Sequence, residues 1–185
     1  MSNYLTFSTN GASESATKFV ANSRTFSFIV DEPPTLGGTD HGANPVEYLL
    51  AGFAGCLNVV AHLVAKEQGI NLKSLKISVD GDINPARLLG LSTDDRAGFQ
   101  SLRVHLIPDT DATHVELKKW LETVEDRCPV RDNLANHTPL HLGVIAVHTR
   151  ALNRFVFAWL IQSVVLFGIL LVNFFLIFSI MNMVF

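Results

Sequence analysis

The chain has 185 residues, enough for one ordinary domain with a sizeable core. Its 14 Lys and Arg and 17 Asp and Glu are dispersed, so no basic patch of the kind that binds nucleic acid is present. Two cysteines are too few for a secreted disulfide scaffold, and the N-terminus lacks the basic start and apolar run of a signal peptide. These features predict a cytoplasmic domain.

The first part of the chain predicts three strands and a loop. Strand patterns occur at residues 4–7, 17–21 and 24–30, where apolar or aromatic residues recur or alternate. Residues 31–43 follow and are rich in Pro, Gly and Asp, so they form a loop that continues neither a strand nor a helix.

A helix is predicted for residues 45–68 because both of its ends carry strong boundary signals. Asn44 suits the N-cap, Pro45 the first helical position and Glu47 the third, as in a capping box. Gly69 suits the end of the helix.

The apolar residues of this helix cover most of its circumference, which is typical of a buried central helix. They are Tyr48, Leu49, Leu50, Phe53, Cys56, Leu57, Val59, Val60, Leu63 and Val64. We expect Gly52 and Gly55 to let another backbone approach closely, since each glycine costs the helix about 1 kcal/mol without a packing reason.

The next part of the chain predicts two strands, two helices and a final strand. Alternating apolar residues indicate strands at 72–84 and 99–107, with a loop between them. Helical spacing indicates an amphipathic helix at about 113–125, and a short helix begins at Cys128-Pro129. Residues 140–149 form the last predicted strand. The order βββ–α–ββ–α–α–β indicates an α+β fold rather than an alternating α/β fold.

The end of the chain differs from the rest, because residues 155–185 contain no charged side chain. A helix spans a ~30 Å hydrocarbon layer with roughly 20 apolar residues, and this segment is longer. Arg150 and Arg154 at its start favour a cytoplasmic position for the preceding domain. We therefore predict a domain at 1–150 and an apolar C-terminal helix within 151–185, a candidate transmembrane anchor. A buried core element and a non-native extension are the alternatives.

The two cysteines occupy different predicted positions. Cys128 lies at a helix start, where backbone N–H groups and the helix dipole favour a thiolate. Cys56 lies in mid-helix among apolar residues, so we expect it to be the deeper thiol, and it needs a nearby cation to react. Alternatively, Cys56 is an unreactive apolar side chain that fills a gap in the core. No spacing of Cys and His predicts a metal, and no motif predicts a cofactor.

Two stretches carry a resemblance to a known family. NPVEYLLAGFAGCLNVVAHL at 44–63 and CPVRDNLAN at 128–136 resemble the OsmC/Ohr superfamily, the osmotically inducible and organic-hydroperoxide-resistance proteins. The loop DEPPTLGGTDHGANP resembles that of one OsmC-like branch. The resemblance covers roughly residues 5–148. It implies an OsmC-like fold, an intertwined homodimer with active sites at the subunit interface, and reduction of organic hydroperoxides through a cysteine pair with a dithiol as reductant.

The resemblance also assigns roles to individual residues. Cys56 matches the peroxidatic cysteine, whose thiolate attacks the peroxide, releases an alcohol and becomes a sulfenic acid. Cys128 matches the resolving cysteine, which condenses with it to a disulfide. The family activates its nucleophile with an arginine held by a glutamate. Arg24 is the candidate, because Lys18 is the only other Lys or Arg before Asn44.

Glu47 is the candidate glutamate, but it departs from the family pattern. In the characterised peroxidases the glutamate directly follows the Asn-Pro pair, where this chain has Val46. Glu47 precedes Cys56 by nine residues. Because each residue of a helix is rotated by about 100° from the one before it, these two side chains lie on nearly opposite faces. Glu47 is therefore either catalytic or only a helix cap.

Together these features predict a thiol-dependent peroxidase that reduces organic, lipid-like hydroperoxides in oxidative stress defence. The alternative is a non-catalytic OsmC-like dimer that binds an apolar ligand or acts as a stress-associated structural protein, and the displaced glutamate favours it. The expected partners are a second copy of the chain, a small hydroperoxide and a dithiol reductant. Nucleic acid is not expected, and residues 155–185 would supply any contact with a membrane.

Overall fold

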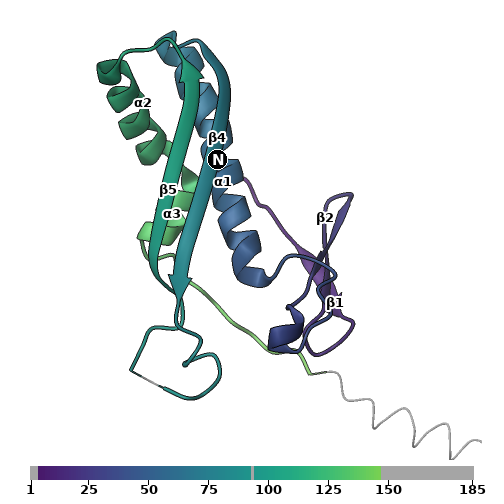
Figure 1. Cartoon of the computed structure of the whole chain (residues 1–185). Coiled ribbons are helices and arrows are strands. Elements are labelled where there is room, and N and C mark those ends of the chain that lie inside the picture. The colour runs from purple at the N-terminus through teal and green to yellow at the C-terminus, as the bar shows by residue number, and fades with distance from the viewer. Residues whose placement is uncertain (1–3, 93, 147–185) are drawn as a thin grey trace, which may run out of the picture. The chain divides into compact units, whose positions relative to one another are not determined.

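Two antiparallel sheets and three α-helices form the part of the chain that the structure, a computed structural model, describes: residues 4–92 and 94–146 (Figure 1). The chain divides into two units, Met1–Thr138 and Pro139–Phe185, and all of these elements belong to the first. The predicted α+β class is confirmed. The predicted domain boundary at residue 150 lies outside the described residues and stays a prediction.

The first sheet contains β1 (Asn10–Ser13), β2 (Phe19–Ser23) and β3 (Phe26–Val30) in that order, each antiparallel to the next. The strands predicted at 17–21 and 24–30 correspond to β2 and β3.

The strand predicted at residues 4–7 is wrong, because β1 forms further along the chain, at residues 10–13. Residues 4–9 are exposed and form no strand. The turn before β2 sets this register: the backbone N–H of Glu14 donates to the Lys18 carbonyl at 2.9 Å. A turn fixes which residues face each other across a hairpin, whatever the apolar pattern before it.

The loop between β3 and the long helix is held by Asp31, whose side chain is fully buried. Its carboxylate accepts hydrogen bonds from the Thr39 hydroxyl at 2.6 Å, the Thr39 backbone N–H at 3.1 Å and the His41 backbone N–H at 3.2 Å. The bond from the Thr39 hydroxyl lowers the pKa of Asp31 to about 2, although burial acts in the opposite direction. A short 3₁₀ helix, η1 (Pro34–Leu36), lies within this loop.

The helix α1 (Pro45–Gln68) begins and ends as predicted. The Asn44 side chain accepts a hydrogen bond from the Glu47 backbone N–H at 2.9 Å, and the Glu47 carboxylate accepts one from the Asn44 backbone N–H at 2.8 Å. Gly69 follows in the left-handed region with φ +70°, the usual geometry at a helix end. Both boundaries are therefore set by local signals.

One face of α1 is buried rather than its whole circumference. The buried residues are Phe53, Leu57, Val60, Ala61, Val64 and Ala65. Leu49, Val59 and Leu63 are exposed, Val59 to 65%. A Cβ added at Gly52 or Gly55 would meet no described atom within 4 Å. The prediction of a helix buried on all sides, with a close backbone at these glycines, is wrong for the single chain because its other elements cover only one side.

The second sheet is a long ribbon made of β4 (Leu72–Ile83) and β5 (Phe99–Thr110), close to the two strands predicted there. The ribbon is followed by α2 (His114–Arg127) and α3 (Pro129–Ala135), which match the two predicted helices. β4, α2 and α3 all contact α1 (Figure 1). The core thus lies between α1, the ribbon and the two later helices.

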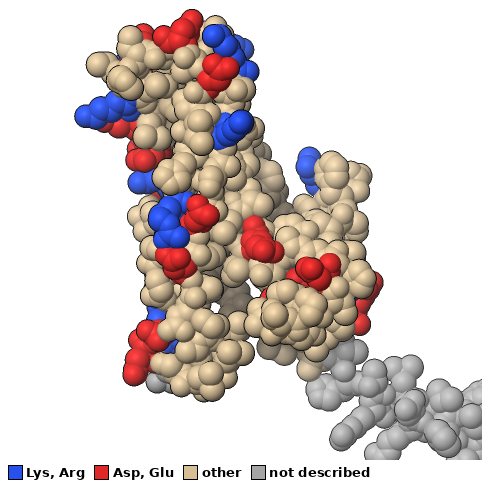
Figure 2. Space-filling view, viewed as in Figure 1, with Lys and Arg blue, Asp and Glu red and all other residues tan. Residues whose placement is uncertain are grey.

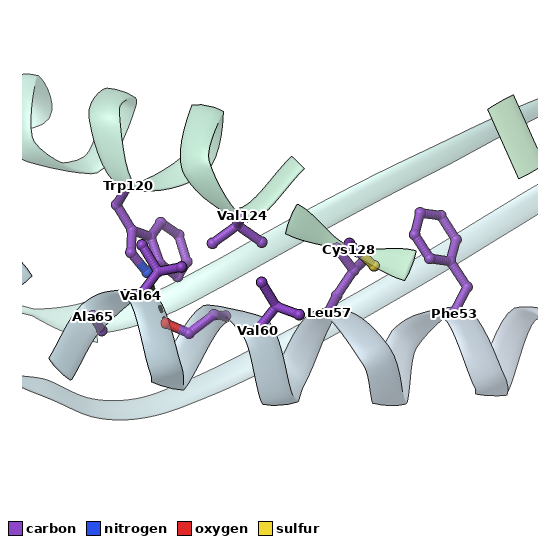
Figure 3. Close-up of a cluster of buried hydrophobic side chains, with 9 residues drawn as sticks. Phe53, Leu57, Val60, Val64, Ala65, Trp120, Val124 and Cys128 are labelled. Carbon is purple, nitrogen blue, oxygen red and sulfur yellow. Dashed lines mark hydrogen bonds between the residues drawn. The ribbon is translucent and has the colours of Figure 1, made fainter. Parts of the chain in front are cut away.

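The core joins the buried face of α1 to α2 and to the start of α3 (Figure 3). Val64 of α1 and Val124 of α2 are both fully buried. The Trp120 indole N–H donates to the Ala61 carbonyl at 2.9 Å, which satisfies the polar atom of a buried aromatic side chain. These contacts fix α2 against α1.

The final predicted strand is absent from its described part, residues 140–146. The apolar side chains of this segment are almost fully exposed: Leu140, Leu142, Val144 and Ile145. A strand needs a neighbour to satisfy its N–H and C=O groups, and no described strand pairs with this segment. Residues 147–149 and the apolar segment 155–185 lie outside the described residues, so the C-terminal helix and the membrane anchor stay predictions.

Among the described residues, α1 has the length and composition that would let a helix cross a membrane. One third of its most apolar stretch is buried inside the structure. Because core helices of water-soluble domains meet the same criteria, this property alone identifies no membrane span. On the face seen in Figure 2, acidic and basic side chains are interspersed.

The helix α2 offers a matched test of the core, since Val124 is fully buried whereas Val115 is 80% exposed. We expect Val124→Ala to lower the free energy of unfolding by about 2 kcal/mol, because it removes two buried methyl groups and leaves a cavity. Val115→Ala should change it by less than about 0.5 kcal/mol. Urea unfolding of both variants measures the difference, and equal losses would contradict this description of the core.

Candidate functional site

The two cysteines meet although they are 72 residues apart in the sequence. Cys56 lies in the middle of α1, and Cys128 lies between α2 and α3. Their Sγ atoms are 3.2 Å apart, and both are free thiols. A disulfide bond needs about 2.05 Å between the sulfurs, so a small movement would bring them to bonding distance.

The burial of the two thiols is the reverse of the sequence expectation. Cys128 is only 1% exposed and belongs to the core cluster, beside Leu57 in Figure 3. Cys56 is half-buried. The expectation that Cys56 is the deeper thiol is therefore wrong, because only one face of α1 is covered and Cys56 lies at the margin of that face. Of the two cysteines, Cys56 is the more exposed residue.

Burial raises the pKa of the Cys128 thiol above its ordinary value. The backbone N–H of Arg131 acts in the opposite direction, the adjacent Cys56 sulfur adds to the rise, and the backbone N–H of Val130 again opposes it. The start of α3 thus does supply N–H groups, but burial outweighs them. The expectation that the helix start favours a Cys128 thiolate is therefore wrong, because the pKa of this thiol is raised. The protonated Cys128 thiol donates a hydrogen bond to the Cys56 sulfur.

Arg24 lies in the turn between β2 and β3 with φ +54°. Its guanidinium carbon is 5.1 Å from the centre of the Phe26 ring, a cation–π contact. Within residues 4–92 and 94–146, no hydrogen bond or ion pair joins Arg24 to either thiol. The chain by itself does not bring this arginine to the cysteines, and its catalytic role stays a prediction.

Glu47 is exposed at the start of α1, and its carboxylate is engaged in the capping box with Asn44. In the described part of the chain it contacts neither Arg24 nor a thiol. The geometry matches the helix-cap interpretation of Glu47. A catalytic role for Glu47 likewise stays a prediction.

The ion pair between Glu67 and Arg127 was not predicted from the sequence. Glu67 near the end of α1 binds the Arg127 guanidinium through both carboxylate oxygens. This hydrogen bonding lowers the pKa of Glu67. The positive charge of Arg127 is thereby balanced by the Glu67 carboxylate. The Arg131 guanidinium has a longer ion pair, at 4.0 Å from the Glu125 carboxylate. Glu67 and Arg127 are 60 residues apart, so no local pattern could have indicated the pair.

Two pockets have walls from α1 and β5. The larger, of about 540 Å³, lies between the first half of α1, the far end of the ribbon and α3. The smaller, of about 380 Å³, lies between β5 and α2. Phe53, Val104 and Arg131 line both, whereas neither cysteine lines either one. No group of three or more His, Cys, Asp or Glu that could hold a metal occurs in the described ranges.

The comparison with known families agrees with this fold. A family model described as OsmC-like protein matches residues 38–143, and the chain belongs to this family. The resemblance noted from the sequence is thus confirmed.

Three comparisons, with proteins of Mycoplasma pneumoniae and Elizabethkingia anophelis, illustrate the similarity. The chain is 28% identical over 108 residues to a hydroperoxide reductase from M. pneumoniae, covering 57% of this chain and 72% of that protein. A solved OsmC-like protein from M. pneumoniae superposes with a TM-score of 0.62 at 23% identity, covering 71% of this chain and 88% of that chain. An organic hydroperoxide resistance protein from E. anophelis superposes with a TM-score of 0.54 at 22% identity, covering 72% and 90%. At these identities the structural likeness supports the fold alone.

The different environments of the thiols predict different reactivities. We expect iodoacetamide to alkylate Cys56 much faster than Cys128 at neutral pH, because Cys128 is buried and its pKa is raised. Modification of Cys128 should increase as the pH rises beyond the ordinary thiol range, since its thiolate forms only there. Peptide mass spectrometry after timed alkylation measures both rates, and the urea-unfolded chain is the control in which the rates should converge. Faster modification of Cys128 in the folded chain would contradict the geometry.

Proposed function

We propose that this chain is a thiol-dependent peroxidase that reduces organic, lipid-like hydroperoxides, with Cys56 as nucleophile and Cys128 as resolving thiol. The observation that carries the proposal is the 3.2 Å contact between the two sulfurs, one half-buried and one buried. The relatives named hydroperoxide reductase, at 28% identity, support the same chemistry.

The reaction divides into three steps. The Cys56 thiolate attacks the terminal oxygen of the hydroperoxide, the O–O bond breaks, and the alkoxide takes up a proton and leaves as an alcohol. The Cys128 sulfur then attacks the Cys56 sulfenic acid, so that an S–S bond forms and an S–O bond breaks. A dithiol finally reduces the disulfide by two thiol–disulfide exchanges and is itself oxidised.

The environments of the two thiols suit these different roles. Cys56 is the more exposed of the two cysteines, which suits the residue that meets the substrate first. Cys128 is held protonated by burial, and its proton can leave with the hydroxide of the sulfenic acid as water. Arg24 is proposed as the cation that favours the Cys56 thiolate. Because Arg24 does not contact Cys56 within the described chain, the proposal requires that a second copy supply it.

A homodimer is therefore part of the proposal, and apolar surface of the single chain supports it. Leu49, Val59 and Leu63 form an exposed face on α1, around which Gly52 and Gly55 leave open space. The segment 140–146 exposes its apolar side chains and pairs with no described strand. A second copy would cover the first feature and offer a neighbouring strand to the second.

The second candidate function is a non-catalytic dimer that binds an apolar ligand or has a structural role under stress. The capping box favours it, because a Glu47 carboxylate bound to the Asn44 N–H is not free to hold an arginine. The two candidates differ in whether Cys56 consumes peroxide.

The decisive measurement is turnover of cumene hydroperoxide with dithiothreitol as reductant. We expect Cys56→Ser to abolish turnover, leaving only the rate of the reductant alone, because the nucleophile is lost. Without dithiothreitol, Cys128→Ser should consume about one equivalent of peroxide and form no Cys56–Cys128 disulfide, whereas we expect mass spectrometry to detect this disulfide in the unsubstituted chain.

Asn58→Ser is the matched control, since it places a serine at an exposed position of the same helix and should leave turnover unchanged. If the unsubstituted chain and Cys56→Ser consume peroxide at the same slow rate, the non-catalytic candidate stands instead. If peroxide oxidation yields no Cys56–Cys128 disulfide, Cys128 has no part in the mechanism.

The dimer has its own test. We expect sedimentation velocity to give twice the 20.3 kDa mass of the chain. Val59→Glu should weaken association at least about tenfold, because it places a charge in the apolar face of α1. Val115→Glu adds the same charge to an exposed position of α2 and should have no effect. A monomer, or equal effects of both substitutions, would contradict the proposed interface.

A further inference from the structure

One buried carboxylate oxygen, Oε2 of Glu32, has no hydrogen-bond partner. Among the residues that the structure describes, it is the only buried side-chain nitrogen or oxygen of this kind. Glu32 as a whole is only half-buried, so its side chain still reaches the surface. Because a carboxylate that is withdrawn from water without a partner has an unfavourable free energy, Glu32 is suited to a cation that the single chain does not supply.

Glu32 lies beside the start of α1. The backbone N–H of Asp31, the residue before it, donates to the Ala43 carbonyl at 3.3 Å. Ala43 directly precedes the N-cap residue Asn44. The loop of residues 31–43 thus begins and ends next to the first turn of the helix. It carries three acidic residues and no Lys or Arg.

This loop follows a strand that contacts the exposed face of α1. The Tyr48 hydroxyl donates to the Ile29 carbonyl at 2.8 Å, so the end of β3 lies against the face of α1 that carries Tyr48. Tyr48 and Val59 are eleven residues apart, which is close to three helical turns, so they share that face. Val59 is exposed and belongs to the apolar face proposed for a second copy. A helix packed along this face would therefore approach the loop.

The other end of the same face carries a positive charge. Lys66 follows Val59 by seven residues, about two turns, and is exposed. No ion pair within the described part of the chain includes Lys66. The neighbouring Glu67 is already bound to Arg127. The exposed face of α1 thus ends in an unpaired cation, whereas an unpaired carboxylate lies beside its start.

These charges select the orientation in which two copies meet. In a parallel pair of α1 helices, Lys66 would face Lys66 and the two acidic loops would face each other, which is unfavourable. In an antiparallel pair about a two-fold axis, each Lys66 lies opposite the loop of the other copy. Asn44 and Lys66 are each eleven residues from Gly55, beside which a second backbone has room, so a crossing there brings the opposite charges together.

We propose that Lys66 of one copy binds Glu32 of the other, twice in a symmetric dimer whose α1 helices cross antiparallel near Gly52 and Gly55. The inference rests on the homodimer of the proposed function, to which it adds the orientation of the two chains and a contact that fixes it. Each ion pair supplies the partner that the Glu32 carboxylate lacks in the single chain. Because the two-fold axis repeats every contact, a substitution at either residue acts twice.

Carbodiimide cross-linking tests the contact directly, since it joins a carboxylate to an amine that touches it. We expect peptide mass spectrometry of the cross-linked dimer to identify a Glu32–Lys66 link. The 22 residues of helix between Asn44 and Lys66 span about 33 Å, so this link forms only between two chains. Dimers that are cross-linked at other sites but not between these two residues would overturn the contact.

Charge reversal measures what the ion pair contributes to association. We expect Glu32→Lys and Lys66→Glu each to weaken the dimer at least about tenfold in sedimentation equilibrium, because each places like charges together at two sites. Combining both substitutions restores opposite charges, so the dissociation constant should return to within about threefold of that of the unsubstituted chain. Circular dichroism verifies that all three variants are folded.

Lys119→Glu is the matched control, because it reverses a charge at an exposed position of α2, which packs on the opposite, buried face of α1. It should associate as the unsubstituted chain does. The ion pair is overturned if neither single substitution weakens the dimer, or if the combined variant associates as weakly as the single ones.

The outcome is separable from that of the proposed function. A dimer that Val59→Glu disrupts and the charge reversals leave intact would overturn the ion pair alone. A monomeric chain would overturn both the dimer and the ion pair. Turnover of cumene hydroperoxide is measured independently, and its absence in a dimer with the Glu32–Lys66 contact would overturn the peroxidase proposal alone.

Discussion

The packing of α2 against one face of α1 is the contact on which the thiol pair depends. Val64 and Val124 exclude water completely at this contact, and the Trp120 N–H is satisfied by the Ala61 carbonyl. Because Cys128 follows directly after α2, fixing that helix also fixes the position of its sulfur against Cys56. Two residues with no local relation in the sequence are thus brought together by hydrophobic burial.

The same packing gives the two sulfurs different properties. Cys128 lies within the core, where desolvation outweighs the N–H groups at the start of α3 and raises its pKa. Cys56 lies at the edge of the buried face and remains partly accessible. A difference in burial is sufficient to distinguish the more exposed cysteine from the protected one. Activation of the accessible sulfur then needs a charge from elsewhere, which is the reason that the proposed function includes a second copy.

The features that could be predicted from the sequence are those set by neighbouring residues. The capping box at Asn44 and the left-handed Gly69 fixed the ends of α1 correctly, and alternation located β4 and β5. The position of β1 and the absence of a strand at residues 140–146 could not be predicted, since a strand forms only where a partner and a turn place it. The cysteines were identified from the family motifs, but their order of burial and the Glu67–Arg127 pair depend on packing between distant segments.

The open side of α1 has a consequence for how this chain behaves in water. Leu49, Val59 and Leu63 expose apolar side chains on one side of α1, whereas the opposite side of the helix is buried in the core. The hydration of exposed apolar surface is unfavourable, and contact with another apolar surface lowers the free energy. By mass action, the fraction of molecules that keep this surface hydrated falls as the chain is concentrated.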